Sequence, residues 1–259
     1  MSRQSLENIP VSDTVQLTAR IGEIKGGAAV MVSHEDHVIE YFDSLQTIEI
    51  FRAIRRAHPG YLRLIEDFGK LAQGHCEDSR VFEPGCATGA MASMVTLLGR
   101  YPVMEYVGID PANGAQYRSL RIPDEFRLVK QKFLEWSEPD LFDVALSRFT
   151  VHHFPDKLDH WYGHIARHLI PNGRYLHMDH VFPEDGETVR DALHELALAV
   201  PIGESQNAAD RDAWIRHFLY DWSLFLPVST HLEAMARSGL RGSIAGQYRD
   251  QVIIEAVKY

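Results

Sequence analysis

The feature that most constrains the fold is a rhythm of strand, turn and helix that starts at Arg80 and repeats along the chain. Five short apolar runs are predicted as strands, at residues 80–84, 105–110, 126–131, 142–150 and 174–182. Helical patterns separate several of them, for example at 88–98 and 156–170. Short apolar strands that alternate with helices are typical of a parallel sheet covered by helices on both faces.

The end of the chain adds a different kind of pairing. Residues 242–248 and 250–259 are predicted as two strands joined by a tight turn at Arg249 and Asp250. Only a hairpin makes so short a connection, so one of these strands runs antiparallel. We therefore expect an α/β fold with a doubly wound, Rossmann-like sheet of seven strands, in which five parallel strands are followed by a C-terminal antiparallel hairpin. Ordinary dinucleotide-binding folds do not end in this way.

The pattern divides the chain into four parts: an N-terminal helical cap (1–78), a ligand-binding core (79–182), a helical insertion that forms the substrate pocket (183–239) and the closing strands (240–259). In the cap, helices are expected at 37–57 and 59–73, the second opened by a proline. Residues 15–32 fit a hairpin and a helix equally well, and are a candidate arm of a homodimer. The insertion is predicted to be helical at 184–216 and 221–239, the latter ending at a glycine.

Charge and composition exclude several classes of partner. The net charge is −10, from 26 basic and 36 acidic residues, which argues against a nucleic-acid substrate. No stretch reaches the ~18 apolar residues of a membrane span, and residues 1–10 lack an apolar signal region. The two cysteines, Cys76 and Cys86, form neither a disulfide framework nor a zinc spacing. We expect a cytoplasmic protein that acts on a small molecule in biosynthesis.

The turn after the first predicted strand indicates the ligand. Its spacing is Gly85, Ala87, Gly89, which lacks the third glycine of the dinucleotide fingerprint and the lysine of a triphosphate loop. Glu83, just before the turn, would repel a phosphate and suits a cation. Asp110 ends the second strand, where a carboxylate takes both hydroxyls of a ribose. A nucleoside without a pyrophosphate and with a positive charge fits this pattern, and S-adenosylmethionine is such a molecule.

Four motifs in order, "EPGCATGAM", "VGID", "FDVALSRFTVHHFP" and "IPNGRYLHMD", resemble those of class I S-adenosylmethionine-dependent methyltransferases. The resemblance covers residues 80–181, and the closing hairpin also matches that fold. It assigns the cofactor contacts in order along the chain: Glu83, Gly85, Cys86, Ala87 and Gly89 to the methionine part, Asp110 to the ribose, Phe133 and Leu134 to the adenine, and Ser147 and Arg148 to the sulphonium region. The family often has an acidic residue where this chain has Lys132.

A closer likeness, carried by "RRAHPGYLRLIEDFGKLA", "EPGCATGA", "FTVHHF" and "FPED", is to the carboxy-S-adenosylmethionine synthase-like subfamily. That subfamily modifies the cofactor itself with prephenate, whose carboxylate is read by an arginine on the helix that corresponds to 229–238. This chain has Leu232, Glu233 and Ala234 there, and Arg237 a turn later. The expected activity is therefore methyl transfer to a small molecule. The alternative is conversion of S-adenosylmethionine itself, by carboxylation or by cyclisation with release of methylthioadenosine.

The candidates for proton transfer follow the fourth and fifth strands. His152 and His153 come directly after the fourth strand, and Asp179 and His180 end the fifth. A histidine titrates near pH ~6.5 and so suits a general base, whereas the alternative is packing at a helix entry. Alternation along a strand sends Asp179 and His180 to opposite faces, so only one of them is expected to point into the site.

Three further features each have two interpretations. Tyr41 either covers the sulphonium with its ring or packs in the core. His34 and His37 have the spacing of a metal pair, but two histidines alone rarely close a site, so a helix start capped by Ser33 is expected and no metal. Residues 220–227 are rich in aromatic side chains and either wall the substrate pocket or seal the insertion onto the core. Arg148 either binds a carboxylate or pairs with a nearby acid.

Overall fold

The computed structural model describes residues 59–87, 91–92, 95, 103–111, 126–183 and 224–259. Four of the expected features lie outside these residues: the segments 15–32, 37–57 and 184–216, and the pair His34 and His37. The candidate site residues Tyr41 and Gly89 also lie outside them. The division of the chain into four parts stays a prediction.

The described elements confirm the expected rhythm. They are α4 (Pro59–Cys76), β1 (Arg80–Pro84), β2 (Glu105–Ile109), β3 (Phe126–Val129), η3 (Phe133–Glu135), β4 (Phe142–Arg148), η4 (Val151–His153), η5 (Pro155–Lys157), α6 (Leu158–His168), β5 (Leu169–His180), α9 (Val228–Arg237), β6 (Leu240–Tyr248) and β7 (Gln251–Lys258). Among the residues between β1 and β2, Met91, Ala92 and Val95 are helical, as the sequence predicts.

In the described part of the chain, seven strands form one sheet in the order β3-β2-β1-β4-β5-β7-β6. The pairs among β1 to β5 are parallel, whereas β7 runs antiparallel to both β5 and β6. The predicted α/β sheet with a closing antiparallel hairpin is therefore confirmed. The chain order reverses direction between β1 and β4, and doubly wound folds bind ligands at the carboxyl ends of the strands beside such a point.

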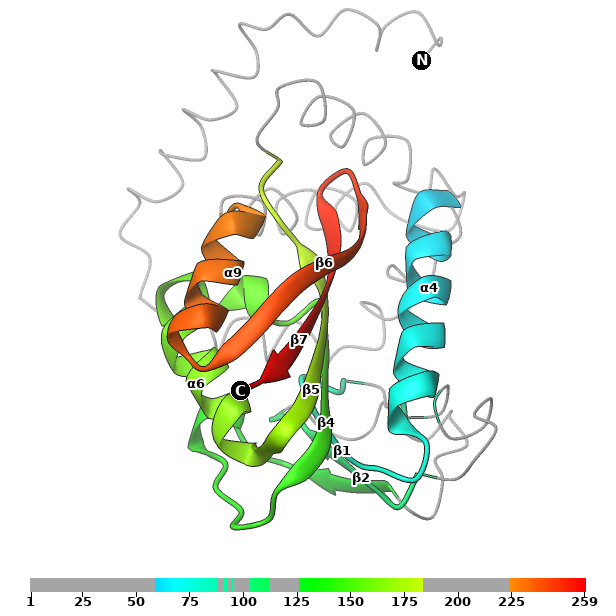
Figure 1. Ribbon diagram of the computed structural model, residues 1–259, viewed down its shortest axis with the longest axis vertical. Helices are drawn as coiled ribbons and strands as arrows, with labels where there is room; N and C mark the ends of the chain where they lie inside the picture. The colour runs from blue at the N-terminus through cyan, green and yellow to red at the C-terminus, as the bar shows by residue number, and fades with distance from the viewer. Residues whose placement is uncertain (1–58, 88–90, 93–94, 96–102, 112–125, 184–223) are drawn as a thin grey trace, which may run out of the picture.

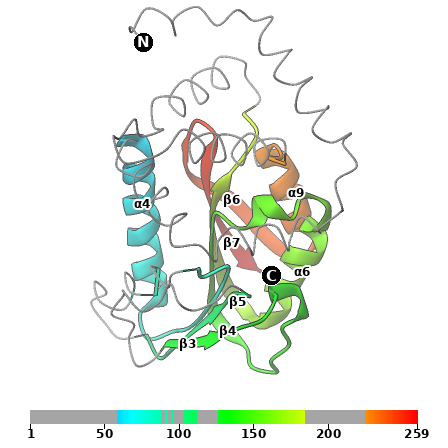
Figure 2. The same cartoon turned by 180° about the vertical axis from the view of Figure 1, so that it is seen from behind.

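Helices cover both faces of the sheet. Figure 1 shows the sheet nearly edge-on, with α4 on one side and α6 and α9 on the other, and Figure 2 shows the same arrangement from behind. One apolar cluster lies between the sheet and α6 with α9, and includes Phe82, Trp161 and Tyr175. A second cluster lies on the α4 side, and includes Phe68 and Tyr106. β1 and β2 are buried at every position after the first, as expected for strands that are covered on both faces.

The largest differences from the predicted boundaries are at the starts of α9 and β5. The helix expected from residue 221 begins only at Val228, after Pro227. A proline disfavours helical backbone in the residue before it, and Pro227 itself has an extended ψ of 147°. β5 begins at Leu169, earlier than expected, because residues 170–173 bulge out of its pairing with β4. The predicted stop of α9 at Gly239 is confirmed, since that residue has a φ of +81°.

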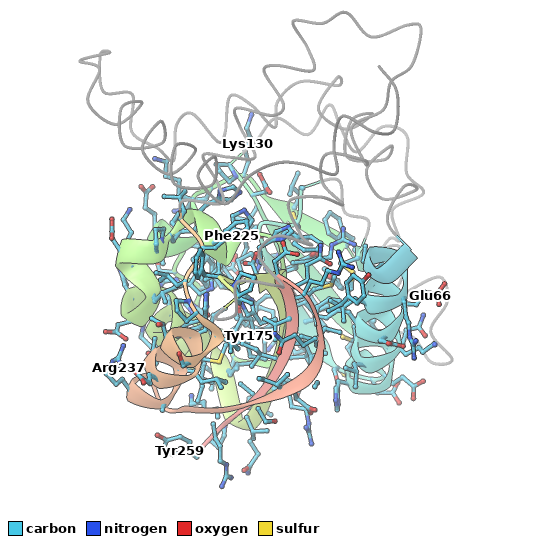
Figure 3. All side chains as sticks on the ribbon, turned by 90° about the horizontal axis from the view of Figure 1, so that it is seen from above. Glu66, Lys130, Tyr175, Phe225, Arg237 and Tyr259 are labelled. Carbon is cyan, nitrogen blue, oxygen red and sulfur yellow. The ribbon has the colours of Figure 1, made fainter. Side chains whose placement is uncertain are left out.

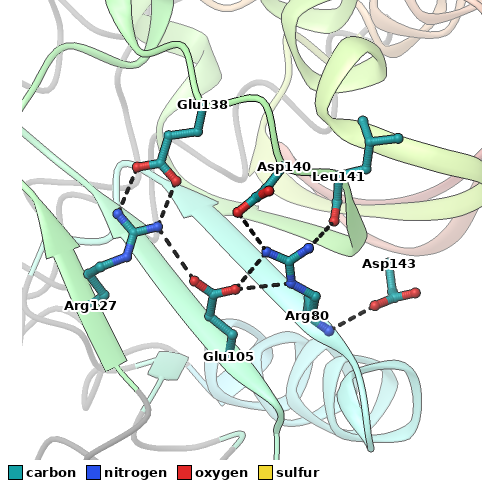
Figure 4. A network of polar contacts seen from close by, with 7 residues as sticks. All are labelled: Arg80, Glu105, Arg127, Glu138, Asp140, Leu141 and Asp143. Carbon is teal, nitrogen blue, oxygen red and sulfur yellow. Dashed lines mark hydrogen bonds and ion pairs between the residues drawn. The ribbon is translucent and has the colours of Figure 1, made fainter.

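An ion-pair network ties together the ends of the strands opposite to the predicted ligand site (Figure 4). The guanidinium of Arg80 donates hydrogen bonds to Oε2 of Glu105, at 3.0 and 2.9 Å, and to the carbonyl of Leu141. Arg127 donates to both oxygens of Glu138, at 2.7 and 2.6 Å. These contacts join β1, β2, β3 and the segment before β4. No helix in the described part of the chain has the length and apolar character needed to cross a membrane.

Candidate active site

The turn after β1 contacts the loop after β4. Gly85 has a φ of +71°, and its N–H donates to the carbonyl of Ile109 at 2.8 Å. A Cβ atom on Gly85 would lie 2.3 Å from Oγ1 of Thr150, which is far inside van der Waals contact. Only glycine therefore fits both the left-handed backbone and the close approach of Thr150. The turn after β1 and the loop after β4 thus lie in close contact at this point.

Asp110 links the same turn to the end of β2. It is buried, and its Oδ2 accepts the N–H of Ala87 at 2.8 Å. Ala87 has a φ of +41°, so the turn is bent where this hydrogen bond forms. The side chain of Cys86 is buried beside Gly108, whose Cβ position would lie 2.7 Å from Sγ. Asp110, Ala87 and Cys86 thus lie together, as the sequence predicts for neighbouring strand ends.

Glu83 is a buried carboxyl group on the α4 side of β1. Its Oε2 accepts a hydrogen bond from the hydroxyl of Tyr106 at 2.7 Å. Burial raises the pKa of Glu83 to about 8, against the opposing effects of the Tyr106 hydrogen bond and the charge of Arg148. Burial disfavours a lone negative charge here, so a cation placed beside Glu83 would be bound strongly by the ionised form. Tyr106 was not a sequence candidate.

Ser147 and Arg148 lie on opposite faces of β4. Arg148 is within electrostatic reach of Glu83 on the α4 side. Ser147 is fully buried and pairs in register with His177 of β5. It follows Ala145 by two residues, and Ala145 belongs to the cluster under α6 and α9. The structure therefore brings Arg148, but not Ser147, to the Glu83 side.

The two candidates for adenine contact differ in burial. The ring of Phe133 is buried among aromatic rings, 4.7 Å from Trp161 and 4.6 Å from His164 between centroids. Leu134 is partly buried and packs against the same cluster. Phe133 is thus a core residue, and Leu134 and the backbone of η3 are left as the more accessible surface.

A buried His–Asp pair follows β4. Nδ1 of His152 lies 2.5 Å from Oδ1 of Asp179. Oδ2 of Asp179 accepts the backbone N–H groups of Thr150, Val151 and His152 at 3.2, 2.7 and 3.1 Å. Because three amides and one ring converge on one carboxylate, the short helix η4 is held directly over the end of β5.

The charge of Asp179 is stabilised despite complete burial. Burial acts to raise its pKa, but the His152 ring, through its charge and its hydrogen bond, holds the pKa well below the usual range. An ionised carboxylate only accepts hydrogen bonds, so Nδ1 of His152 carries a hydrogen, and when the ring is neutral its lone pair is on Nε2. That is the arrangement of an oriented general base.

His180 and His153 lie beside the pair. The ring centroids of His152 and His153 are 3.9 Å apart, and those of His152 and His180 are 5.6 Å apart. Which of Asp179 and His180 points into the site stays a prediction, but both contact His152. The reason is that η4 folds across the end of β5, where it meets side chains from both faces of the strand.

Two further residues complete this part of the site. Phe225, from the predicted aromatic wall, is buried and stacks on His180 with an interplanar angle of 2°. In Figure 3 it lies on the side of the sheet that α6 covers. Asp250 bonds to the His180 ring, and sequence reasoning treated it only as a turn residue. Among the described residues, no group of three or more His, Cys, Asp or Glu side chains could hold a metal ion.

The comparisons with known proteins agree with this geometry. A family model described as a methyltransferase domain matches residues 50–242, well over half of the chain. The comparison with curated proteins gave no match.

Similar solved structures are found at low identity. The plantazolicin methyltransferase BpumL, in complex with a monoazolic desmethylPZN analog and SAH, has 11% identity and a TM-score of 0.60, over 94% of this chain and 99% of that one. Magnesium protoporphyrin IX methyltransferase from Synechocystis PCC 6803, with bound SAH, has 15% identity and a TM-score of 0.54, over 88% of this chain and 100% of that one. N-methyltransferase NodS from Bradyrhizobium japonicum WM9, in complex with SAH, has 13% identity and a TM-score of 0.54, over 83% of this chain and 99% of that one.

At identities this low, the structural similarity shows a shared fold and no more. The family model adds the class of enzyme, since it covers the turn after β1, the end of β2 and the His–Asp pair in one match. From its fold and from this match, the chain belongs to the methyltransferase domain family and is a transferase.

Proposed function

We propose that this protein transfers the methyl group of S-adenosylmethionine to a small-molecule acceptor, with His152 as the general base. The observation that carries the proposal is the contact of Gly85 with Thr150, because it joins two halves of one site. The turn on one side fits a nucleoside. The loop on the other side begins with Thr150 and leads directly into the His152–Asp179 pair.

The residues around the turn fit the cofactor. Gly85 has no side chain, so the turn can approach Thr150 of the β4 loop closely and the two segments can border one ligand. Glu83 provides a buried carboxylate for the methionine amino group, and Asp110 provides one for the ribose hydroxyls. We assign Leu134 and η3 to the adenine ring. S-adenosylmethionine, when bound, supplies an electrophilic methyl group on a positively charged sulphur.

The chain itself supplies alignment and proton removal. Asp179 keeps the hydrogen of His152 on Nδ1, so Nε2 can accept the proton of an O–H or N–H acceptor. The imidazolium that forms is then stabilised by the charge of Asp179. General base catalysis of this kind contributes about 10²- to 10⁴-fold to a rate. His153 and His180 border the same space and bind or orient the acceptor.

Charge and burial support a small-molecule acceptor. A net charge of −10 does not favour a polyanion, so a small molecule is the acceptor class. Burial of Phe225 against His152 and His180 gives the site an aromatic wall with few polar groups, as in small-molecule pockets. Both cysteines are buried free thiols, in keeping with the reducing cytoplasm where we place the reaction.

The alternative is conversion of the cofactor itself, as in the carboxy-S-adenosylmethionine synthase-like subfamily. Its carboxylate-binding arginine would have to come from α9. The only arginine of this helix, Arg237, lies on the surface, where it forms ion pairs with Asp159 at 2.9 Å and Glu233 at 4.0 Å. This arrangement favours methyl transfer, because no α9 guanidinium reaches the His152 loop.

The product decides between these reactions. The protein would be incubated with S-adenosylmethionine carrying a labelled methyl group and with the small-molecule fraction of a cell extract. Methyl transfer yields S-adenosylhomocysteine and a labelled acceptor, and both should be lost in His152→Gln. Methylthioadenosine or a carboxylated sulphonium as the product would instead establish the alternative. Unlabelled acceptors, together with no binding of S-adenosylmethionine in a titration, would refute both.

A further inference from the structure

A second His–Asp pair lies beside the first, and the proton transfer to His152 does not use its carboxylate. Nδ1 of His180 lies 2.9 Å from Oδ2 of Asp250. Both side chains are mostly buried, at 17% and 11% exposure. The two residues are 70 positions apart in the sequence, so the pairing depends on the closing hairpin.

The ring of His180 packs against two aromatic rings in addition to its contact with Asp250. Phe225 stacks on it with centroids 4.9 Å apart, and Phe149 packs against it at the same distance with an angle of 35°. Close packing against these two rings restricts rotation of the imidazole about its Cβ–Cγ bond. Its orientation is therefore as strongly determined as that of His152.

Asp250 is itself held in place by the main chain. Its carbonyl accepts the N–H of Val181 at 2.7 Å, directly after β5. Arg249 precedes it in the left-handed region with a φ of +54°, and Gln251 pairs with His180 across β5 and β7. The hairpin turn thus aims a carboxylate at the end of the neighbouring strand.

We propose that Asp250 is a positioning residue, which keeps the hydrogen of His180 on Nδ1 and leaves the ring lone pair on Nε2. The site then contains two imidazoles with the same tautomer, with centroids 5.6 Å apart, each oriented by its own carboxylate. His180 acts as a second hydrogen-bond acceptor for the bound acceptor molecule. This inference rests on the proposed function for the role of His180, but the tautomer itself does not depend on it.

The test is nitrogen-15 NMR of protein labelled in its histidines, in mildly alkaline buffer where neutral rings show their tautomer. The signal of His180 is assigned by its loss in His180→Gln. In the wild type, His180 should be in the Nδ1–H form. In Asp250→Asn the side-chain amide can donate to the ring, so the Nδ1–H form should lose its majority. Asp250→Glu keeps a carboxylate and should retain it.

A matched control separates positioning from general damage. Asp143 is another carboxylate that accepts a backbone N–H, that of Arg80 at 2.9 Å, at the opposite end of the sheet. Asp143→Asn should leave the tautomer of His180 unchanged. An Nε2–H form in the wild type, or an unchanged Nδ1–H form in Asp250→Asn, would overturn the proposal, and the wild-type measurement stands even if a variant fails to fold.

An activity measurement then tests the role of His180 separately. Asp250→Asn should lower methyl transfer to the extract acceptor by about tenfold or more, as expected when a ring is held in the wrong tautomer. Transfer at the wild-type rate by a protein with a changed tautomer would show that His180 takes no part. If the wild type neither binds S-adenosylmethionine nor transfers a methyl group, the proposed function fails, while the tautomer still decides whether Asp250 positions His180.

Discussion

The carboxylate of Asp179 orients the ring of His152 and also accepts the backbone N–H of the same residue. Oδ1 of Asp179 accepts a hydrogen bond from the ring Nδ1 of His152, and Oδ2 accepts one from the backbone N–H of His152. The side chain and the main chain of the candidate base are thus fixed by one buried group. Any acceptor bound beside the ring meets a nitrogen whose place is set by the fold.

The first prediction concerns the base itself. His152→Gln should lower the rate of methyl transfer by about 10²- to 10⁴-fold, because the glutamine side chain cannot take up a proton. Binding of S-adenosylmethionine, measured by calorimetry, should be unchanged. The control is His160→Gln, which replaces an exposed histidine of α6 and should alter neither quantity. Methyl transfer at the wild-type rate in His152→Gln would assign the proton transfer to another group.

The second prediction concerns the ribose. Asp110→Ala should weaken binding of S-adenosylmethionine by about 1–3 kcal/mol, the cost of losing hydrogen bonds to a charged group. Part of this loss comes from the turn, since Asp110 also accepts the N–H of Ala87. A titration of both sulphur nucleosides measures it. Asp143→Ala, which removes a carboxylate bonded to a strand N–H elsewhere, should leave the affinity intact, and equal affinities in the two variants would contradict the assignment.

The third prediction concerns the turn after β1. Gly85→Ala places a methyl group against Thr150 and keeps the backbone in the left-handed region. We expect a loss of about 1–3 kcal/mol in the free energy of unfolding and weaker cofactor binding. Gly163 of α6 is the matched control, because nothing lies within 4 Å of its Cβ position. Gly163→Ala should stabilise the protein by up to about 1 kcal/mol, and denaturant unfolding of both variants compares them.

Much of this fold could be predicted because buried parallel strands leave a strong signal. β1 and β2 have apolar side chains on both faces, so their ends, and with them Glu83, Gly85 and Asp110, could be placed from the sequence. The carboxyl ends of parallel strands share one edge of the sheet. The nearness of these residues therefore follows from the pattern alone.

The acid–base part of the site could be predicted only in part. His152 and Asp179 follow adjacent strands, and this was enough to name both. Their pairing depends on η4, a single short turn with no signal in composition. Asp250 was not predicted as a site residue, because its contact with His180 requires β7 to lie next to β5. Local sequence patterns do not determine the order of strands in a sheet. Ser147 and Arg148 are neighbours on one strand, so alternation alone predicts that their side chains lie on opposite faces of the sheet.

The fourth prediction concerns the ion-pair network of Arg80. Arg80→Ala removes the contacts with Glu105 and the carbonyl of Leu141, both partly exposed. We expect a loss of about 1 kcal/mol in the free energy of unfolding, because exposed ion pairs contribute little each. The difference from the wild type should shrink at high salt. A loss that is independent of salt would indicate that packing of the Arg80 stem on Phe142 matters more than charge.

The last prediction concerns acid stability and the row of polar side chains behind Asp179. Tyr175, His177 and Asp179 follow one another at intervals of two along β5, so they share the face that α6 and α9 cover. His177 is fully buried, and burial lowers its pKa to about 3. His231 of α9, 5.7 Å away between ring centroids, has its pKa lowered by burial to about 4.

A lowered histidine pKa fixes the direction of the effect. Between pH ~6.5 and about 3, the unfolded chain binds a proton at residue 177 and the folded protein does not. The stability that His177 contributes is therefore complete above pH ~6.5 and is lost as the pH falls. At pH 5 the loss is about 2 kcal/mol for this residue. Glu83 acts in the opposite sense, because its pKa is raised to about 8 and its proton is bound in the folded state.

The variant His177→Phe isolates this contribution. It keeps a buried ring but removes the titrating group, so its unfolding free energy should fall less between pH 7 and pH 5 than that of the wild type, by about 2 kcal/mol. Urea unfolding at both pH values measures the difference. His160→Gln, which removes an exposed histidine, should show the wild-type pH dependence. If His177→Phe and the wild type lose the same stability over this range, the folded protein accommodates a proton at His177, and the row behind Asp179 is not the neutral, dry environment that its burial indicates.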